Sequence, residues 1–150
     1  MKILFKTFVL ISLALSSHAA IAACTLDVEV GDALTFSSTQ MSVEKSCGTI
    51  TVNLKHTGKL AASVMGHNWV LAKDTDANDV AAKGLAAGLA NNYVPAGDAR
   101  VLASTKIIGG GESTSISFST DSLSAGGKYI YVCTFPGHSF VMRGTLNVGA

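Results

Sequence analysis

The stretch "KYIYVCTFPGHSFVMRGTLNV", residues 128–148, combines two strand-like segments with an unusual loop. The runs "KYIYVC" and "GTLNV" have the composition of β-strands. The loop between them holds a proline, a glycine and three soft or borderline metal ligands. These are the thiol of Cys133, the imidazole of His138 and the thioether of Met142. The stretch therefore predicts two strands that hold a ligand-bearing loop near the C-terminus.

Alternating apolar and polar residues recur over most of the chain. The segments "TLDVEV" (25–30) and "TITVNLKH" (49–56) alternate clearly, and "SISFS" (115–119) is also strand-like. Glycine and polar clusters at 31–32, 109–111 and 126–127 separate the segments. Several short alternating strands with regular turns are typical of an antiparallel sandwich or barrel. We therefore predict an all-β domain.

One segment departs from this pattern. The run "DANDVAAKGLAAGLANNY" (76–93) is rich in alanine, and Val80, Leu85 and Leu89 fall near helical spacing. Gly84 and Gly88 weaken the helical preference. We predict one short helix inserted between strands.

The first 22 residues have the layout of a secretory signal peptide. Lys2 and Lys6 precede an apolar run that ends in Ala20-Ile21-Ala22, a small-x-small cleavage site. The run is too short to span a bilayer comfortably, although an N-terminal membrane anchor is the alternative, and no later segment is long enough to span one. We predict a signal peptide at 1–22, a single mature domain at 23–150, and export to an oxidising compartment.

The charge of the mature chain argues against several classes of partner. Without Lys2 and Lys6, nine basic residues remain against ten acidic ones, and no basic stripe or charge run is present. Nucleic acid and anionic membrane surfaces are therefore not expected as partners.

Three cysteines remain after export, and an odd number leaves one thiol unpaired. The simplest assignment pairs Cys24 with Cys47 in the oxidising compartment and leaves Cys133 free for chemistry. An alternative comes from "IAAC" (21–24), which loosely resembles a lipoprotein signal. In that case Cys24 would carry a lipid anchor and Cys47 would be unpaired.

A further histidine completes a plausible metal site. His67 lies in "MGHNW" (65–69), just after a glycine and before a strand-like segment. Together with Cys133, His138 and Met142 it gives two imidazoles, a thiolate and a thioether. That set describes a type 1 blue-copper centre, with the methionine as a weak axial ligand. The sequence therefore predicts one copper, which carries single electrons and has no substrate.

Other interpretations of these residues are possible. Cys133 and Met142 could be ordinary buried apolar residues, and His138 an ordinary turn residue. A Cys–His nucleophilic enzyme would need a helix N-terminus or an orienting Asn or Asp near the thiol. Zinc accepts the same nitrogens and sulfur but not the thioether as a rule. A copper-storage protein would show several Met or Cys motifs, and a copper enzyme would need ligands for a second ion.

The stretches "KSCGTITVNL", "VMGHNWVLA" and "YVCTFPGHSFVMRGTL" resemble the azurins, small bacterial blue-copper proteins of the cupredoxin family. The resemblance covers essentially all of residues 23–150, and the Cys-x₄-His-x₃-Met spacing is specific to azurins. It implies a Greek-key β-sandwich and the Cys24–Cys47 disulfide. It assigns copper ligation to four side chains and, weakly, to one backbone carbonyl. The side chains are those of His67, Cys133, His138 and Met142, and the carbonyl is that of Gly66.

The resemblance also implies the surroundings of the copper and the surface used for docking. Asn68 would tie the ligand-bearing loops together, Phe135 would lie beside the ligands, and His138 would present its ring edge to solvent as the exit for electrons. Redox proteins would dock transiently on an apolar patch. The residues expected to form this patch are Leu60, Val64, Met65, Leu85, Pro136, Phe140 and Val141.

Two positions depart from the common azurin pattern. Thr57-Gly58 follows His56 where many azurins have Pro-Gly, so a pH-linked change at this histidine cannot be transferred. Leu85 stands where some azurins have a surface methionine.

Overall fold

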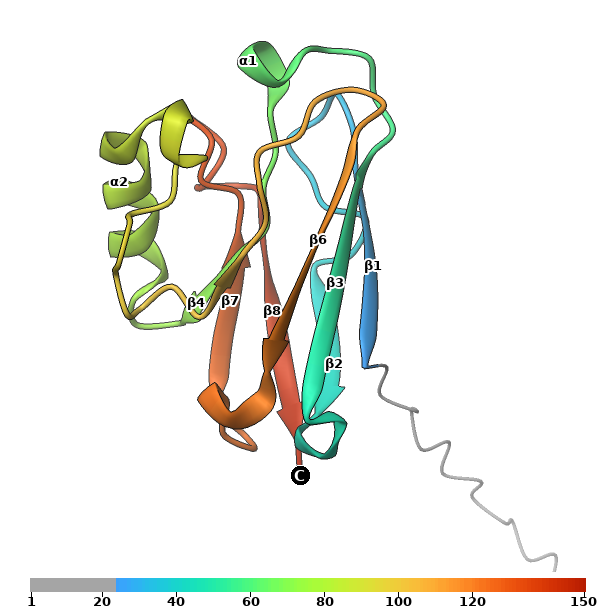
Figure 1. Cartoon of the computed structure of the whole chain (residues 1–150), viewed down its shortest axis with the longest axis vertical. Coiled ribbons are helices and arrows are strands. Elements are labelled where there is room, and N and C mark those ends of the chain that lie inside the picture. The colour runs from blue at the N-terminus through green and yellow to red at the C-terminus, as the bar shows by residue number, and fades with distance from the viewer. Residues whose placement is uncertain (1–23) are drawn as a thin grey trace, which may run out of the picture.

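The computed structural model describes residues 24–150. The predicted signal peptide lies outside these residues. Within residues 24–150, eight strands form two sheets that face each other (Figure 1). The strands are β1 (Thr25–Val30), β2 (Gln40–Glu44), β3 (Thr49–His56), β4 (Val70–Lys73), β5 (Ala103–Ser104), β6 (Ser113–Ser119), β7 (Lys128–Val132) and β8 (Arg143–Gly149).

The strand order confirms the predicted cupredoxin-like sandwich. One sheet has the order β1-β3-β6 and the other has the order β2-β8-β7-β4-β5. The chain crosses repeatedly between the sheets, and the pairs β1–β3 and β2–β8 are parallel while the others are antiparallel. Both sheets are therefore mixed, which the alternating sequence pattern alone did not indicate.

The alternation expected for the strands matches the observed burial. In β1 and β3 every second residue is buried between the sheets. Trp69 is completely buried there and stacks on Tyr131 of β7, with ring centroids 5.6 Å apart. Strand β7 ends at Val132, so this packed core fixes the position at which the chain enters the Cys133 loop. A rigid scaffold therefore supports the loop.

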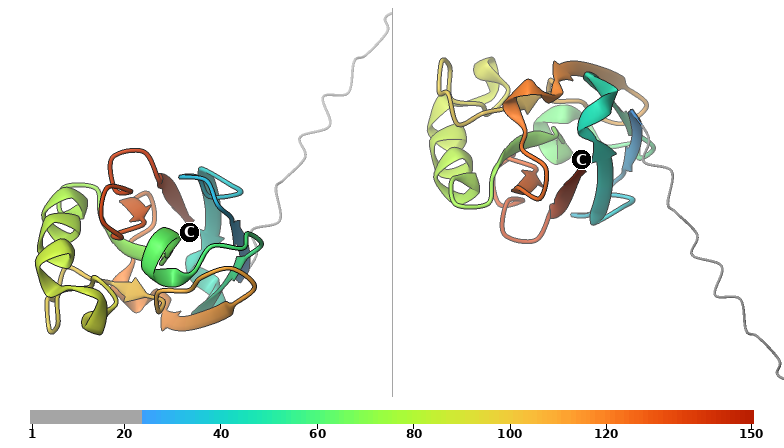
Figure 2. Two further views of the ribbon diagram at one scale, coloured as in Figure 1. Left: turned by 90° about the horizontal axis from the view of Figure 1, so that it is seen from above. Right: turned by 90° about the horizontal axis from the view of Figure 1, so that it is seen from below.

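The predicted helix is present but shorter than its alanine-rich segment. Helix α2 (Ala77–Ala87) ends at Gly88, whose φ of 74° lies in the left-handed region that favours glycine. A turn of 3₁₀ helix, η2 (Leu89–Asn91), follows. Ala77 and Val80 pack α2 onto the outer face of the larger sheet, against Val70 and Val132. The helix therefore lies beside the end of β7 (Figures 1 and 2).

Three further short helical turns were not predicted. Helix α1 (Ala62–Met65) directly precedes Gly66 and His67. The 3₁₀ turns η1 (Lys45–Cys47) and η3 (Thr120–Ser122) lie at the other end of the sandwich. Single turns of this length carry no sequence periodicity, because they are shorter than two helical repeats.

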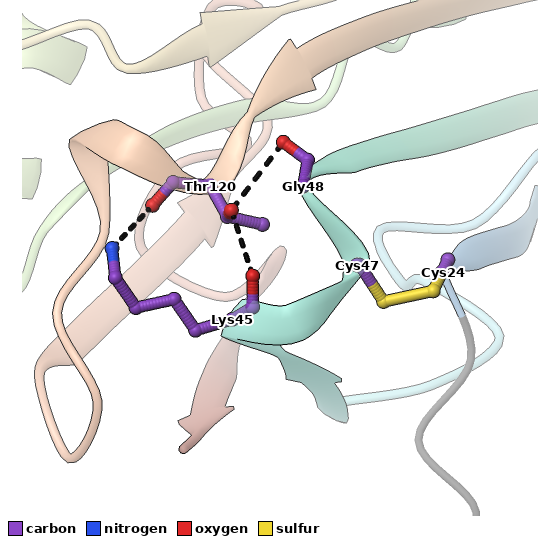
Figure 3. The surroundings of a disulfide bond; sticks show 5 residues. All are labelled: Cys24, Lys45, Cys47, Gly48 and Thr120. Atoms are coloured by element: carbon purple, nitrogen blue, oxygen red, sulfur yellow. Dashed lines mark hydrogen bonds between the residues drawn. A yellow bond between two sulfur atoms is a disulfide. The ribbon is translucent and has the colours of Figure 1, made fainter.

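The predicted Cys24–Cys47 disulfide is confirmed, with Cα atoms 5.5 Å apart. Its sequence separation of 23 residues corresponds to a stabilisation of about 3 kcal/mol in the chain-entropy model. Lys45, two residues before Cys47, donates through Nζ to the carbonyl of Thr120 (Figure 3) and to the carbonyl of Leu123. The Thr120 hydroxyl donates back to the Lys45 carbonyl. The disulfide and these bonds join the first strand to η1 and η3.

An ion-pair cluster fixes the segment after α2. Arg100 donates through Nε and Nη2 to the carboxylate of Asp98, at 2.9 and 2.6 Å, and Arg100 Nη1 lies 3.3 Å from Asp79 of α2. Lys83 of α2 lies 3.7 Å from Asp98. The side-chain and backbone bonds from Arg100 hold the pKa of Asp98 well below its usual range.

We expect this cluster to contribute stability that disappears in acid. Because the folded-state pKa of Asp98 is lowered, its contribution is present above the unfolded-state pKa of about 3.9 and is lost as the pH falls below it. In urea unfolding of the metal-free protein, Asp98→Asn should be less stable than wild type at pH 6, and the difference should shrink by pH 3. The control Asp121→Asn alters an exposed carboxylate in η3. A difference between Asp98→Asn and wild type that is constant from pH 6 to pH 3 would contradict this assignment.

Candidate metal centre

Three potential ligands from distant parts of the sequence meet at one end of the sandwich. The Sγ of Cys133 lies 3.7 Å from Nδ1 of His67 and 3.6 Å from Nδ1 of His138. The three donor atoms all lie within 4.8 Å of one another, and all three residues are buried. Cys133 follows β7, His138 belongs to the loop, and His67 lies between α1 and β4. The two histidines and the cysteine predicted to bind metal are therefore brought together.

Backbone hydrogen bonds close the loop on itself. The N–H of Cys133 donates to the carbonyl of Met142 at 3.0 Å, and the N–H of Met142 donates to the carbonyl of His138 at 2.9 Å. The N–H of His138 donates to the carbonyl of Phe135 at 3.0 Å, across the Pro136-Gly137 turn. These bonds pull three of the predicted ligand residues into one turn, as the proline and glycine suggested.

His67 is held from both sides. Its backbone pairs with Ile108, with N···O distances of 3.0 and 2.9 Å in the two directions. Its ring Nε2 lies 2.8 Å from the carbonyl oxygen of Gly31. A carbonyl only accepts, so Nε2 carries the proton and Nδ1 keeps its lone pair facing Cys133. Burial lowers the pKa of His67 to about 4, which keeps the ring neutral and able to bind a cation.

The thiol of Cys133 has no access to solvent. Burial raises its pKa to about 11, so without a metal the sulfur is protonated at neutral pH. A bound cation would stabilise the thiolate and release that proton. The buried position also prevents large molecules from reaching the sulfur, unlike the reactive cysteines of enzymes, which lie in accessible positions.

The spacing of the donors matches a metal site. Nitrogen and sulfur ligands at about 2.0–2.3 Å from a first-row ion, with angles of about 110–120°, lie about 3.6–3.8 Å from each other. The observed S···N distances of 3.6 and 3.7 Å agree with this value. A donor set of two imidazoles and one thiolate suits copper. The residues present therefore fit the predicted cofactor.

Gly66 brings its backbone close to the thiol. Its carbonyl oxygen lies 4.0 Å from Sγ of Cys133. A Cβ atom at this position would overlap the carbonyl of Ala62 and the side chain of Ile107. A side chain at position 66 would therefore push this carbonyl and the adjacent His67 out of position.

Asn68 joins the two ligand-bearing segments. Its Oδ1 accepts the backbone N–H of Thr134 at 2.9 Å, and its Nδ2 donates to the Thr134 hydroxyl and to the Asn92 carbonyl, both at 2.8 Å. Asn68 follows His67 directly, and Thr134 follows Cys133 directly. The spacing between these two ligands is therefore fixed by a fully hydrogen-bonded, buried amide.

Phe135 and Met142 complete the interior of the site. Phe135 packs on the ring of His138, with centroids 4.6 Å apart, and on Tyr93 at 5.4 Å. Met142 is wholly buried, and its main chain bonds to both Cys133 and His138. Ligation of copper by its thioether stays a prediction.

The exposure of the two histidine ligands differs less than the sequence suggested. His67 is 0% exposed and His138 is 5% exposed. Among residues 24–150, Trp69 Nε1 is the only fully buried side-chain nitrogen or oxygen without a hydrogen-bond partner. His138 Nε2 has no partner in this part of the chain either, so it reaches solvent. The exposed edge of His138 is thus narrow, because Phe135 covers one face of its ring.

Most of the residues predicted for the apolar patch are exposed. Phe140 is 88% exposed, and Val141, Val64, Leu85 and Leu60 are 62%, 61%, 54% and 40% exposed. In the described range, only Leu34 and Leu89 are further large apolar residues with such exposure. Pro136 is exposed and Met65 is half-buried. Most of these residues lie on α1, on α2 and in the segment between β7 and β8. Figure 1 places α1 at the end of the molecule opposite the C-terminus, with α2 and this segment in the same half.

Several supporting residues gave no signal in the sequence. Gly31, Asn92, Ile108 and Thr134 position the ligands through backbone atoms or one hydroxyl. The sequence does not specify which backbone groups meet across a sandwich, so only the topology reveals these contacts. His56, whose role was left open, stacks on His67 with centroids 5.1 Å apart.

Both ring nitrogens of His56 are hydrogen-bonded. Nε2 lies 3.0 Å from the Met65 carbonyl oxygen, and Nδ1 accepts the N–H of Gly58 at 3.1 Å. His56 therefore supports the segment that precedes the ligand His67.

Comparisons with known proteins support the assignment of this centre as a copper site. Residues 22–149 match the family of copper binding proteins described as the plastocyanin/azurin family. The chain is 50% identical over 135 residues to an azurin of Bordetella pertussis, covering 90% of each chain. It is 51% identical over 127 residues to azurin-1 of Alcaligenes xylosoxydans xylosoxydans, covering 85% of this chain and 98% of the relative.

A solved structure of an azurin is also similar to this chain. The azurin Az-iso2 of Methylomonas sp. strain J superposes with a TM-score of 0.82 at 49% identity, covering 86% of this chain and 100% of that one. The family confirms copper as the cofactor of the His67, Cys133 and His138 site. The chain belongs to the plastocyanin/azurin family of copper-binding proteins.

Proposed function

We propose that this protein is a periplasmic electron carrier that moves single electrons between redox proteins and is not an enzyme. His67, Cys133 and His138 would hold one copper ion, with the Met142 thioether and the Gly66 carbonyl as weaker donors. Copper supplies one-electron chemistry between Cu(II) and Cu(I) when bound. The observation that carries the proposal is a buried, pre-positioned His–Cys–His set whose only solvent contact is the edge of one histidine.

The protein's own residues would keep this site nearly unchanged between oxidation states. The Asn68 bonds, the Met142 main-chain bonds and the Gly31 bond to His67 fix each ligand independently of a metal. A site held in this way changes little in structure when its charge changes, and small reorganisation favours fast electron transfer. The thiol is buried among these groups, so a substrate would have no direct access to it from solvent.

Electrons would enter and leave through His138. Its Nε2 edge reaches solvent while Nδ1 faces Cys133, so the ring connects the site to the surface. The exposed apolar residues on α1, on α2 and in the ligand loop would form the docking patch. An uncharged patch suits brief contacts, because little desolvation of charges opposes docking or release.

We expect charges in this patch to slow electron exchange between two copies of the protein. Phe140→Glu places a carboxylate where Phe140 is 88% exposed, and Val141→Lys places an ammonium beside it. Identical charges would face each other on docking and would lose water, so self-exchange should fall about tenfold at low salt. NMR line broadening in mixtures of oxidised and reduced protein measures this rate.

A matched control separates the patch from overall charge. Ala125→Glu introduces the same charge at an exposed position just before β7. It should leave self-exchange nearly unchanged, and none of these variants should alter the visible spectrum. Equal effects of Phe140→Glu and Ala125→Glu would show that the patch is not the electron-transfer surface.

The proposed location depends on the N-terminus. No helix within residues 24–150 is long and apolar enough to cross a membrane. The sulfur of Cys24 is bonded to Cys47, which argues against a lipid on that sulfur. We expect the intact mass of the exported protein to equal residues 23–150 minus two hydrogens. A mass increment corresponding to diacylglycerol, or retention of residues 1–22, would contradict the proposed processing.

A further inference from the structure

A groove lies between α2 and the ligand loop, at the edge of the apolar patch. Its volume is about 580 Å³. Its lining is mainly apolar and comes from both elements. The apolar lining residues are Ala81, Ala82, Leu85, Phe135, Pro136 and Phe140. Phe135 also packs on His138, so the groove lies one ring away from the proposed electron exit.

Among residues 24–150, Arg143 is the one charged residue that lines this groove. Its Nε donates to the Ser139 carbonyl at 2.9 Å, and its Nη2 donates to Oδ1 of Asn78 at 3.0 Å. Both acceptors are neutral, and within residues 24–150 no carboxylate lies in ion-pair distance of the guanidinium. Nη1 has no hydrogen-bond partner in that part of the chain and is not among its fully buried unpartnered atoms, so it is open to solvent.

The acidic residue of α2 forms an ion pair outside the groove. Asp79 follows Asn78 but pairs with Arg100, 3.3 Å away, and does not line the groove. Within the described part of the chain, the groove therefore has mainly apolar walls and one fixed cation without a counter-charge among its lining residues. Because two hydrogen bonds already hold the guanidinium, binding an anion there would require little further ordering of this side chain.

We propose that this groove receives an acidic side chain of the redox partner, with an apolar side chain of the partner packing beside it against Leu85 and Phe140. The proposal rests on the electron-carrier function above and specifies the chemistry of the partner surface. Arg143 would favour partners with acidic rims around their electron-transfer sites over partners with basic rims. The rest of the patch, being uncharged, supplies contact area without this selectivity.

Two forms of one probe protein test this preference. Native cytochrome c has a basic surface, and its succinylated form has an acidic surface around the same haem. Stopped-flow measurement gives the rate of electron transfer between each form and the copper-loaded protein. Arg143→Gln should lower the rate with the succinylated probe about two- to fivefold at low salt, as expected for a rim charge. It should not lower the rate with the native probe, and the effect should vanish near 0.5 M salt, where the Debye length is about 4 Å.

Control variants separate a local role from overall charge. Lys128→Gln makes the same charge change at the start of β7, outside the groove, and should affect the two probes far less. Ala82→Glu places a carboxylate in the groove on the exposed side of α2, and should also slow reaction with the succinylated probe. Its control, Ala125→Glu, should not. A role of Arg143 in structure alone would slow both probes equally, so a loss confined to the succinylated probe identifies docking.

NMR of the Cu(I) protein supplies a readout independent of electron transfer. The amides of Ala81, Ala82 and Phe140 should shift on addition of reduced succinylated cytochrome c, and less so in Arg143→Gln. If Arg143→Gln matches Lys128→Gln with both probes, the groove is not the acidic-partner site, while the carrier function stands. If neither probe exchanges electrons with the copper protein, the proposed function itself fails. If the same amides shift at least as much with rising protein concentration alone as with the succinylated probe, the occupant is a second copy, and the proposed partner is wrong.

Discussion

The variant Cys133→Ser should bind copper without the intense blue colour expected of the wild-type protein. The colour arises from charge transfer between a thiolate and Cu(II), and a hydroxyl oxygen cannot replace the covalent Cu–S bond. Serine is close in size to cysteine, so the buried position should still pack and the fold should persist. Visible absorption of the copper-loaded variant measures the loss, and circular dichroism checks the fold. We expect the intense band to disappear completely.

The other two cysteines provide the control. The double variant Cys24→Ser/Cys47→Ser removes two sulfurs at the opposite end of the sandwich and should keep the blue colour, although its fold is less stable. If Cys133→Ser stays intensely blue, or if the double variant loses its colour while folded, the thiolate of Cys133 is not the copper ligand.

We expect the second large effect at Asn68. Asn68→Leu removes three hydrogen bonds and leaves the buried Thr134 N–H without its partner. Because each unsatisfied buried group costs about 1–3 kcal/mol, the free energy of unfolding should fall by about 2–5 kcal/mol. Leucine has a similar volume, so a cavity does not explain the loss. Urea unfolding of the metal-free protein measures it.

The effect should extend to the metal site. Asn68 follows His67 and bonds to Thr134, which follows Cys133, so the variant should also release copper faster to a chelator. Asn53→Leu is the matched control, because Asn53 makes one exposed bond, to Asp27 at 2.8 Å. It should lose no more than about 1 kcal/mol. Equal losses in the two variants would show that Asn68 has no special role at the site.

The sequence predicts which residues form the metal site better than it predicts the tertiary contacts that place them. Cys133, His138 and Met142 lie within ten residues, so a loop closed by Pro136 and Gly137 has to place them near one another. The contribution of His67 depends on a contact across 66 positions. It could be predicted because a glycine, a histidine and a strand-like segment follow one another at 66–72, and because the family resemblance matched them.

Other features could not be predicted for physical reasons. The parallel pairs β1–β3 and β2–β8 depend on which strands cross between the sheets, and alternation is the same for parallel and antiparallel neighbours here. The narrow exposure of His138 results from Phe135 packing on its ring, a tertiary contact with no sequence pattern. The groove at Arg143 needs α2 and the ligand loop side by side, which only the fold determines.

A redox titration of the copper-loaded protein tests the central claim most directly. The protein is reduced stepwise with a one-electron reagent and reoxidised while its visible absorption is recorded. We predict an intense blue band that is bleached by one electron per chain and fully restored by removal of one electron, with copper retained throughout. Weak absorption typical of ordinary tetragonal Cu(II), uptake of other than one electron, or loss of copper on reduction would contradict the assignment of this chain as a single-electron carrier.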